Sequence, residues 1–173
     1  MERRGFAKRL VSLVLGFILA AVPVGSALAF LLDPLRRKYQ STGFLRVAPL
    51  DSLPEGEPTK HRIIADRDDA WNHYENEPVG AVYVIRNGGD VTAFQVICPH
   101  AGCFVDFDKS VRRFKCPCHA STFKLDGSRD LALNPNTPAA RGLDTLDVEV
   151  RDRDVYVRYQ KFEGLIKEKK PIT

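Results

Sequence analysis

Six potential metal ligands lie within one short window of the chain, and no other feature constrains the fold as strongly. Residues 98 to 121 read CPHAGC, then twelve intervening residues, then CPCHAS. This window holds all four cysteines of the protein and two of its four histidines. Cysteine and histidine are the usual protein ligands of zinc and of iron-sulfur centres. The spacing therefore predicts two short loops, each offering thiolate and imidazole to one metal centre.

The two motifs resemble the paired boxes of the Rieske iron-sulfur family, C-x-H-x-G-C and C-P-C-H-x-S. In that family two cysteines and two histidines hold a [2Fe-2S] cluster, and the histidines replace thiolates on one iron. The resemblance implies four cluster ligands in this chain: Cys98, His100, Cys116 and His119. It also implies a disulfide between Cys103 and Cys118, because quinol-oxidising cytochrome bc-type members carry such a bridge between the boxes.

Two simpler interpretations use the same residues. A structural zinc site would employ four of the six side chains and leave two cysteines without a role. Two disulfides would account for the four cysteines and leave both histidines without a role. The iron-sulfur interpretation gives all six a role.

Residues near the boxes bear on the redox potential and on docking. Ser121 matches a family serine that donates a hydrogen bond to a bridging sulfide. High-potential members carry a tyrosine, which donates to a cysteine sulfur, where this chain has Phe123. The missing bond implies a lower potential and favours menaquinol over ubiquinol. Ala101 and Ala120 stand where leucine and glycine are common, which alters the expected docking surface without removing a ligand.

A proline-bearing loop follows the boxes at residues 133–140, LNPNTPAA. In the family such a loop covers the cluster, so the resemblance gives this role to Pro135 and Pro138. The family usually has glycine before the first proline, whereas this chain has Asn134. The alternative is that the prolines only mark turns in a surface loop.

Strand-like patterns predict an all-β head over residues 44–173. The Rieske resemblance implies stacked antiparallel sheets with a cluster-binding part at about 97–140. Alternation and turn residues predict strands within 44–47, 60–64, 81–85, 91–97, 147–150 and 155–159. Asn87 to Asp90 form the turn of the central hairpin.

One polar segment, residues 66–79, has isolated aromatics and predicts a helical turn. Trp71 and Tyr74 are three residues apart and should pack beneath that turn. His61 and His73 lie outside the cysteine window, and we expect both at the surface.

Residues 10–32 contain no charged side chain. As a helix this run would be about 34 Å long, enough for a hydrocarbon core of about 30 Å. It predicts a single transmembrane anchor, kinked at Pro23, with backbone groups there satisfied by Ser26 or by neighbouring helices. A signal-peptidase site at Ala27-Leu28-Ala29 is the alternative, but the apolar run continues beyond it.

Residues 1–9 precede the anchor and include Arg3-Arg4-Gly5-Phe6-Ala7-Lys8, which resembles a twin-arginine export signal. That route carries folded proteins and would suit a cofactor inserted in the cytoplasm. The basic cluster before the anchor exceeds the one after it, so the head should lie outside the cytoplasm, on the periplasmic side of a bacterial inner membrane. A disulfide persists in that compartment.

Residues 33–43 predict a tether between anchor and head, because Asp33-Pro34 should end the helix and Ser41, Thr42 and Gly43 offer loose backbone. The resemblance implies that the head swings on this hinge. The net charge is about +5 over residues 1–38 and −1 over the remainder, so the head carries no electrostatic footprint for nucleic acid.

These features together imply the electron-transfer subunit of a quinol–cytochrome c oxidoreductase, with a cytochrome b and a c-type cytochrome as partners. The resemblance puts His119 at the quinol, with His100 as the second solvent-facing candidate. The small Rieske subunit of an arsenite oxidase-like enzyme and a soluble Rieske ferredoxin of an oxygenase are the alternatives. The anchor and the additional cysteine pair favour the quinol complex.

Overall fold

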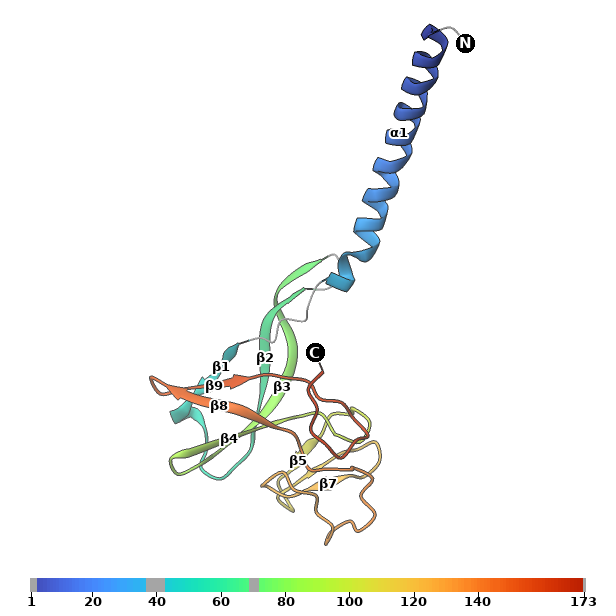
Figure 1. Ribbon diagram of the computed structural model, residues 1–173. Coiled ribbons are helices and arrows are strands. Elements are labelled where there is room, and N and C mark those ends of the chain that lie inside the picture. Colours follow the sequence, from blue (N-terminus) through green and yellow to red (C-terminus); the bar gives the residue numbers. More distant parts are fainter. Residues whose placement is uncertain (1–2, 37–42, 69–71, 173) are drawn as a thin grey trace. The chain divides into compact units, whose positions relative to one another are not determined.

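A computed structural model describes residues 3–36, 43–68 and 72–172 of the chain (Figure 1). These residues form two compact units, one built on an N-terminal helix and the other a β-rich head. Most of the predicted tether, residues 37–42, and Trp71 lie outside the described residues.

Helix α1 (Arg3–Arg36) contains the predicted anchor. Its segment Gly5–Asp33 is long and apolar enough to cross a membrane. Near Pro23, the Ser26 hydroxyl donates to the Val22 carbonyl at 2.8 Å, one turn back along the helix. The predicted helix end at Pro34 is wrong, since α1 continues to Arg36. Proline's fixed φ is compatible with a helix, so the turn can continue at the loss of one N–H donor.

A six-stranded sheet forms the base of the head, with strand order β1-β9-β8-β4-β3-β2. Its strands are β1 (Phe44–Pro49), β2 (Thr59–Asp68), β3 (His73–Asn87), β4 (Asp90–Gln95), β8 (Thr145–Arg151) and β9 (Asp154–Arg158). A 3-10 turn, η1 (Leu50–Ser52), follows β1. All six predicted strands are present, and the central hairpin turns at Gly88, whose φ is +63°.

The helical turn predicted for residues 66–79 is wrong for the described part of this segment, because residues 66–68 belong to β2 and residues 73–79 to β3. Cross-strand contacts stabilise the extended form there. The Arg67 guanidinium lies 4.5 Å from the Tyr74 ring centre, and the Asn76 amide donates to Asp66 at 3.0 Å. Residues 69–71 lie outside the described residues.

The two remaining histidines differ in exposure. His73 is exposed, as predicted. His61 is half-buried rather than on the surface, its ring nitrogen lies 2.8 Å from the Thr59 hydroxyl, and burial lowers its pKa.

Strands β3 and β4 have buried side chains on both faces. Val82, Val84 and Ala93 belong to the core of the sheet. Tyr83 and Phe94, which face one another across the ladder, belong to a second core. Side chains alternate between faces along a strand, so the apolar run after Gly80 supplies both cores at once.

The second core joins the sheet to a smaller subdomain inserted between β4 and β8 (Figure 1). This subdomain has a three-stranded sheet of β5 (Asp106–Asp108), β6 (Arg113–Lys115) and β7 (Thr122–Phe123), in the order β5-β6-β7. The first cysteine motif precedes β5, and the second lies between β6 and β7. The sheet thus carries both motifs on one rigid support.

Candidate metal centre

The first loop, residues 98–103, is named finger one. The Cys98 amide donates to the Cys103 carbonyl at 2.8 Å, and the Gly102 amide donates to the Cys98 carbonyl at 3.0 Å. Gly102 has φ +80°, a conformation that glycine adopts without steric cost. These bonds close finger one on itself, with His100 in the middle of the loop.

The second loop, residues 116–121, is named finger two. It is closed in the same way, by a 2.8 Å bond from the Cys116 amide to the Ser121 carbonyl. Its left-handed position is Ala120, with φ +56°. The residue that replaces the family's usual glycine therefore occupies the conformation for which glycine is best suited.

A disulfide joins the two fingers. Cys103 and Cys118 are bonded, with their Cα atoms 6.6 Å apart, as the family resemblance implied. The His100 and His119 rings lie 4.7 Å apart, centre to centre, and are nearly perpendicular. The thiols of Cys98 and Cys116 are free and only 1% and 2% exposed. The fold thus brings all six predicted side chains to one place.

Not every cysteine in this group can be a metal ligand. The sulfur atoms of Cys103, Cys116 and Cys118 lie within 4.8 Å of one another. Two of these sulfurs are bonded to each other, however, so this trio offers a single thiolate. The remaining donors of the site are the Cys98 thiol and the two imidazoles.

The chemistry of the buried donors fits a metal cluster. Burial raises the pKa of the Cys98 thiol, and the adjacent Cys116 thiol raises it further. A nearby cationic metal reverses this preference, because thiolates bind metal in the deprotonated form. His100 Nδ1 and the Ser121 hydroxyl are buried and have no hydrogen-bond partner among the described residues. Ser121 is close enough to Cys98 to lower that thiol's pKa slightly, without meeting hydrogen-bond geometry.

Comparison with known proteins identifies the family of the domain. Residues 43–148 match the Rieske [2Fe-2S] domain. The chain is 30% identical over 167 residues to the menaquinol:cytochrome c reductase iron-sulfur subunit of Bacillus subtilis (strain 168), and 31% identical over 168 residues to the subunit of the same name from Geobacillus thermodenitrificans. Each alignment covers 95% of both chains. The cytochrome b6-f complex iron-sulfur subunit of Chlorobaculum tepidum is 29% identical over 126 residues, which cover 73% of this chain and 61% of the relative.

The chain therefore belongs to the Rieske [2Fe-2S] family. It is an electron-transfer protein of a cytochrome bc-type complex, and its cofactor is a [2Fe-2S] cluster. The apolar helix α1 is consistent with a membrane anchor.

The predicted tuning residues are both fully buried. Ser121 and Phe123 are 0% exposed, and Phe123 shares the second core with the thiols of Cys98 and Cys116. Pro135 and Pro138 are exposed on the loop that follows.

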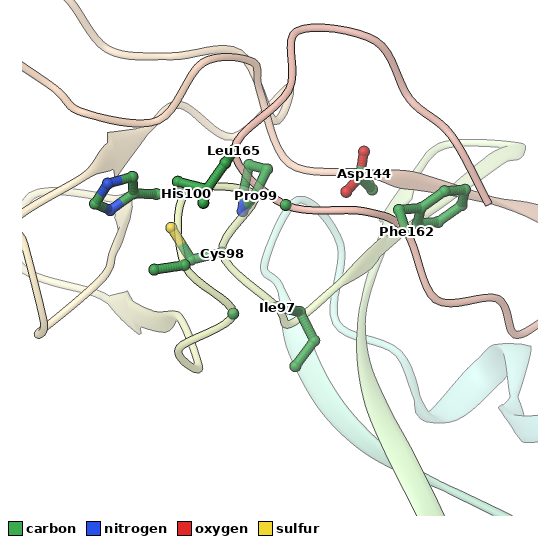
Figure 2. A pocket seen from close by; sticks show the side chains of 10 residues that line it. Ile97, Cys98, Pro99, His100, Asp144, Phe162 and Leu165 are labelled. Carbon is green, nitrogen blue, oxygen red and sulfur yellow. The ribbon is translucent and has the colours of Figure 1, made fainter. Parts of the chain in front are cut away.

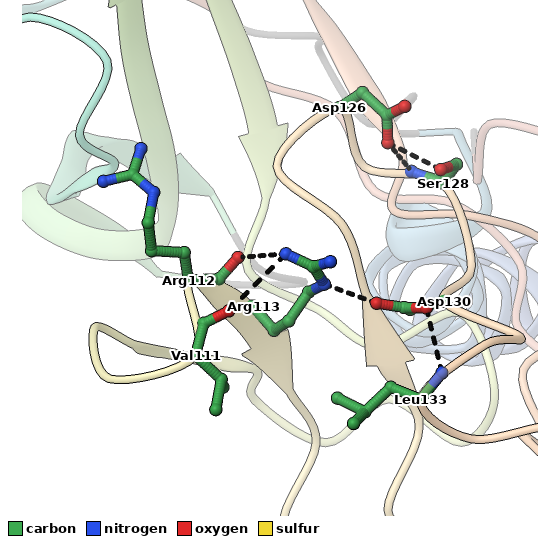
Figure 3. A network of polar contacts seen from close by, with 7 residues as sticks. All are labelled: Val111, Arg112, Arg113, Asp126, Ser128, Asp130 and Leu133. Atoms are coloured by element: carbon green, nitrogen blue, oxygen red, sulfur yellow. Dashed lines mark hydrogen bonds and ion pairs between the residues drawn. The ribbon is translucent and has the colours of Figure 1, made fainter.

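That loop is fastened to finger two by residues that the sequence did not single out as site residues. Asp130, only 2% exposed, pairs with Arg113 of β6, and its other oxygen accepts the Leu133 amide at 3.1 Å (Figure 3). The Arg113 guanidinium holds the pKa of this carboxyl below its usual range. Asn134 then donates from Nδ2 to the Ala120 carbonyl at 2.7 Å. No motif marks the Arg113–Asp130 pair, whereas the unusual Asn134 was visible as a departure from the family pattern.

Proposed function

We propose that the chain is the membrane-anchored iron-sulfur subunit of a menaquinol:cytochrome c oxidoreductase. The observation that carries this proposal is the alignment over 95% of both chains with two proteins of that name. The partners would be a cytochrome b subunit and a c-type cytochrome, and the chain alone would not turn over quinol.

In this proposal the cluster ligands are Cys98, His100, Cys116 and His119. When bound, a [2Fe-2S] cluster with two imidazole ligands supplies one-electron transfer at about −150 to +300 mV. Two neutral imidazoles in place of two thiolates reduce the negative charge at one end of the site. The buried, unpartnered Nδ1 of His100 supports its assignment, and the Ser121 hydroxyl is available to donate to a sulfide.

The exposed end of the site would meet the quinol. His119 is exposed and His100 is half-buried, which supports His119 as the quinol-facing residue and His100 as the second candidate. An imidazole that binds metal through one nitrogen keeps a proton on the other, and a bound cation makes that proton more acidic. His119 can therefore accept a hydrogen bond from quinol, or its proton, when its outer nitrogen is deprotonated.

Phe123 supports menaquinol as the donor. Its ring lies in the core that holds both free thiols and carries no hydroxyl. The sulfurs thus lack one hydrogen-bond donor that would stabilise the reduced cluster, and the midpoint potential should be low for the family. Menaquinol is a stronger reductant than ubiquinol and suits such a potential.

The proposal extends to the membrane arrangement. Residues 1–9 would be a cytoplasmic twin-arginine signal, residues 10–32 a single-pass anchor in the lipid bilayer of the bacterial inner membrane, and residues 33–43 a hinge. The head, residues 44–173, would lie on the periplasmic side. The Cys103–Cys118 disulfide supports this side, since such bonds persist in oxidising compartments.

Purification from membranes in mild detergent tests the proposed complex. Haems of b and c type, menaquinone and two cytochrome chains should co-purify with this subunit. Reduced samples should give the electron paramagnetic resonance spectrum of a Rieske centre. A molybdenum protein in place of cytochromes would contradict the proposal.

A redox titration tests the role of Phe123. The Phe123→Tyr variant should have a higher midpoint potential than wild type, because its hydroxyl can donate to a cysteine sulfur. Phe114→Tyr is a matched control in the same core, since the Phe114 ring packs against Tyr83 and Phe94. A wild-type midpoint high in the Rieske range would contradict menaquinol as donor.

A further inference from the structure

The chain after β9 folds back over finger one. Residues 160–172, here named the C-terminal strap, are closed by bonds from the Glu163 amide to the Lys170 carbonyl at 2.9 Å and from the Ile172 amide to the Lys161 carbonyl at 2.8 Å. Phe162 anchors the strap in the core of the sheet. The strap lies beyond residues 43–148, which match the Rieske domain.

The strap contacts the backbone between two proposed ligands. The Leu165 amide donates to the Pro99 carbonyl at 2.9 Å, and Pro99 lies between Cys98 and His100. Gly164 packs against the same backbone, so that a Cβ there would lie 3.4 Å from the His100 carbonyl. A partly open pocket of about 390 Å³ lies between this part of the strap and finger one (Figure 2).

A buried arginine holds the strap in place. Arg141 donates to the Ile166 carbonyl at 2.6 Å and to the Glu163 carbonyl at 2.7 Å. Two further bonds of 2.8 Å join it to both carboxylate oxygens of Asp144. The side chains of Arg141 and Asp144 are 10% and 4% exposed. A planar guanidinium can serve a carboxylate and two carbonyls together, which an ammonium group cannot.

Leu165 has an unfavourable backbone conformation. Its φ is +63°, although its side chain is 69% exposed and gains little from packing. A β-carbon is sterically disfavoured in this region, which glycine occupies freely. The two arginine bonds on either side of Leu165 and the bond to Pro99 keep it there. Strain that persists only because its surroundings enforce it is a feature of functional sites.

We propose that Arg141 and the Leu165 amide are positioning groups for the cluster. Arg141 fixes the strap, and the strap fixes the Pro99 carbonyl and with it the peptide that joins Cys98 to His100. This inference rests on the proposed assignment of Cys98 and His100 as ligands. Groups that orient metal ligands in this way typically affect metal affinity by about 10- to 100-fold.

A pair of substitutions at Leu165 isolates the amide. Leu165→Pro removes the N–H donor and fixes φ near −65°, which is incompatible with the observed backbone. Leu165→Gly removes the same side chain but keeps the donor and adopts positive φ freely. Both are made in the full-length chain within its purified complex.

Iron release to a chelator is the first measurement, and the electron paramagnetic resonance g-values and the midpoint potential are the second. Leu165→Pro should release iron at least about tenfold faster than wild type and shift the g-values. Leu165→Gly should match wild type in both.

A second pair tests the arginine, in case Leu165→Pro fails to fold. Arg141→Lys keeps the charge beside Asp144 but loses the carbonyl bonds, and should also accelerate iron release about tenfold. Arg158→Lys is the control, because Arg158 makes an exposed pair with Asp147 at 3.4 Å.

Wild-type iron release and g-values in Arg141→Lys, or in a folded Leu165→Pro, would overturn the proposal. Equal effects of proline and glycine at position 165 would also overturn it. A wild-type protein with a Rieske spectrum but no menaquinol turnover would refute the proposed function and leave this test intact.

Discussion

The two fingers are alike in their backbones and different in what holds them. Each is closed by a bond from its first cysteine amide to the carbonyl of its last residue, and each has a left-handed residue before that end. Finger one uses Gly102 and is held by the backbone of a distant strap. Finger two uses Ala120 and is held by the side chain of Asn134, fourteen residues away.

The two fingers thus share one backbone geometry but are supported by different parts of the chain. The same loop closure is reached with glycine at the left-handed position of finger one and with alanine at that of finger two. The Ala120 carbonyl accepts its bond from the Asn134 side chain, which a glycine at position 134 could not supply. Within this one chain, the two fingers present their proposed ligands on different supports.

Removal of the disulfide should have the largest effect, since it frees the fingers from each other. The double variant Cys103→Ser with Cys118→Ser opens a link between residues separated by 15 positions. The free energy of unfolding should fall by about 3 kcal/mol. Thermal unfolding measures this, and the Rieske spectrum should persist initially because no ligand is changed. An unchanged unfolding midpoint would contradict a tie between the fingers.

Asn134→Gly should weaken the support of finger two and leave that of finger one unchanged. It removes the bond to Ala120 and the side-chain oxygen that accepts the Asn136 amide, and it adds glycine's conformational freedom, with an expected loss of about 1–2 kcal/mol. Asn136→Gly is the control, since its side chain is exposed and only its backbone amide bonds to Asn134. Chemical denaturation compares the two. Equal losses would mean that the bond to Ala120 contributes nothing.

Alanine in place of Gly102 and glycine in place of Ala120 should change the free energy of unfolding in opposite directions. Gly102→Ala should destabilise the head by about 1 kcal/mol through φ alone, because a Cβ there would meet nothing within 4 Å. Ala120→Gly should stabilise it by a similar amount. Urea titration of both variants gives the two values. If both variants changed the free energy of unfolding in the same direction, the left-handed positions of the two fingers would not be equivalent.

Acid should weaken the support of finger two slightly. The pKa of Asp130 is lowered by Arg113, so the pair contributes its full stability above the ordinary carboxyl value of about 4 and loses it as pH falls through the lowered folded value. Unfolding followed from pH 7 downward should be less pH-dependent below about pH 4 in Asp130→Asn than in wild type. Asp90→Asn, at an exposed turn, is the control. If stability varied with pH in the same way in wild type and in both variants, the Arg113–Asp130 pair would have no role in supporting finger two.

The sequence predicted the parts of the fold that depend on local pattern. The two boxes predicted the fingers, and alternation predicted the strands of the large sheet. The short strands β5, β6 and β7 were not predicted, because two or three residues carry no periodicity. The segment around Tyr74 was assigned a helical turn because cross-strand contacts, such as that with Arg67, are invisible in sequence.

The supports of the fingers were missed for a related reason. Arg141 and Ile166 are separated by 25 positions, and neither belongs to a motif. Asp130 is a buried acid whose partner, Arg113, lies on another strand. Such pairs are set by tertiary packing, so no local rule identifies them. Ala120 and Asn134 were each visible as unusual, but only the structure links them.

The hairpin of β3 and β4 belongs to two cores at once, with Val84 on one side and Tyr83 on the other. Bending between the base sheet and the subdomain would open the second core, which the hairpin shares with the subdomain. The head is consequently a single mechanical piece. In the proposed membrane arrangement, movement of the redox centre would therefore originate in the segment before the head, and the β structure would move with it as a unit.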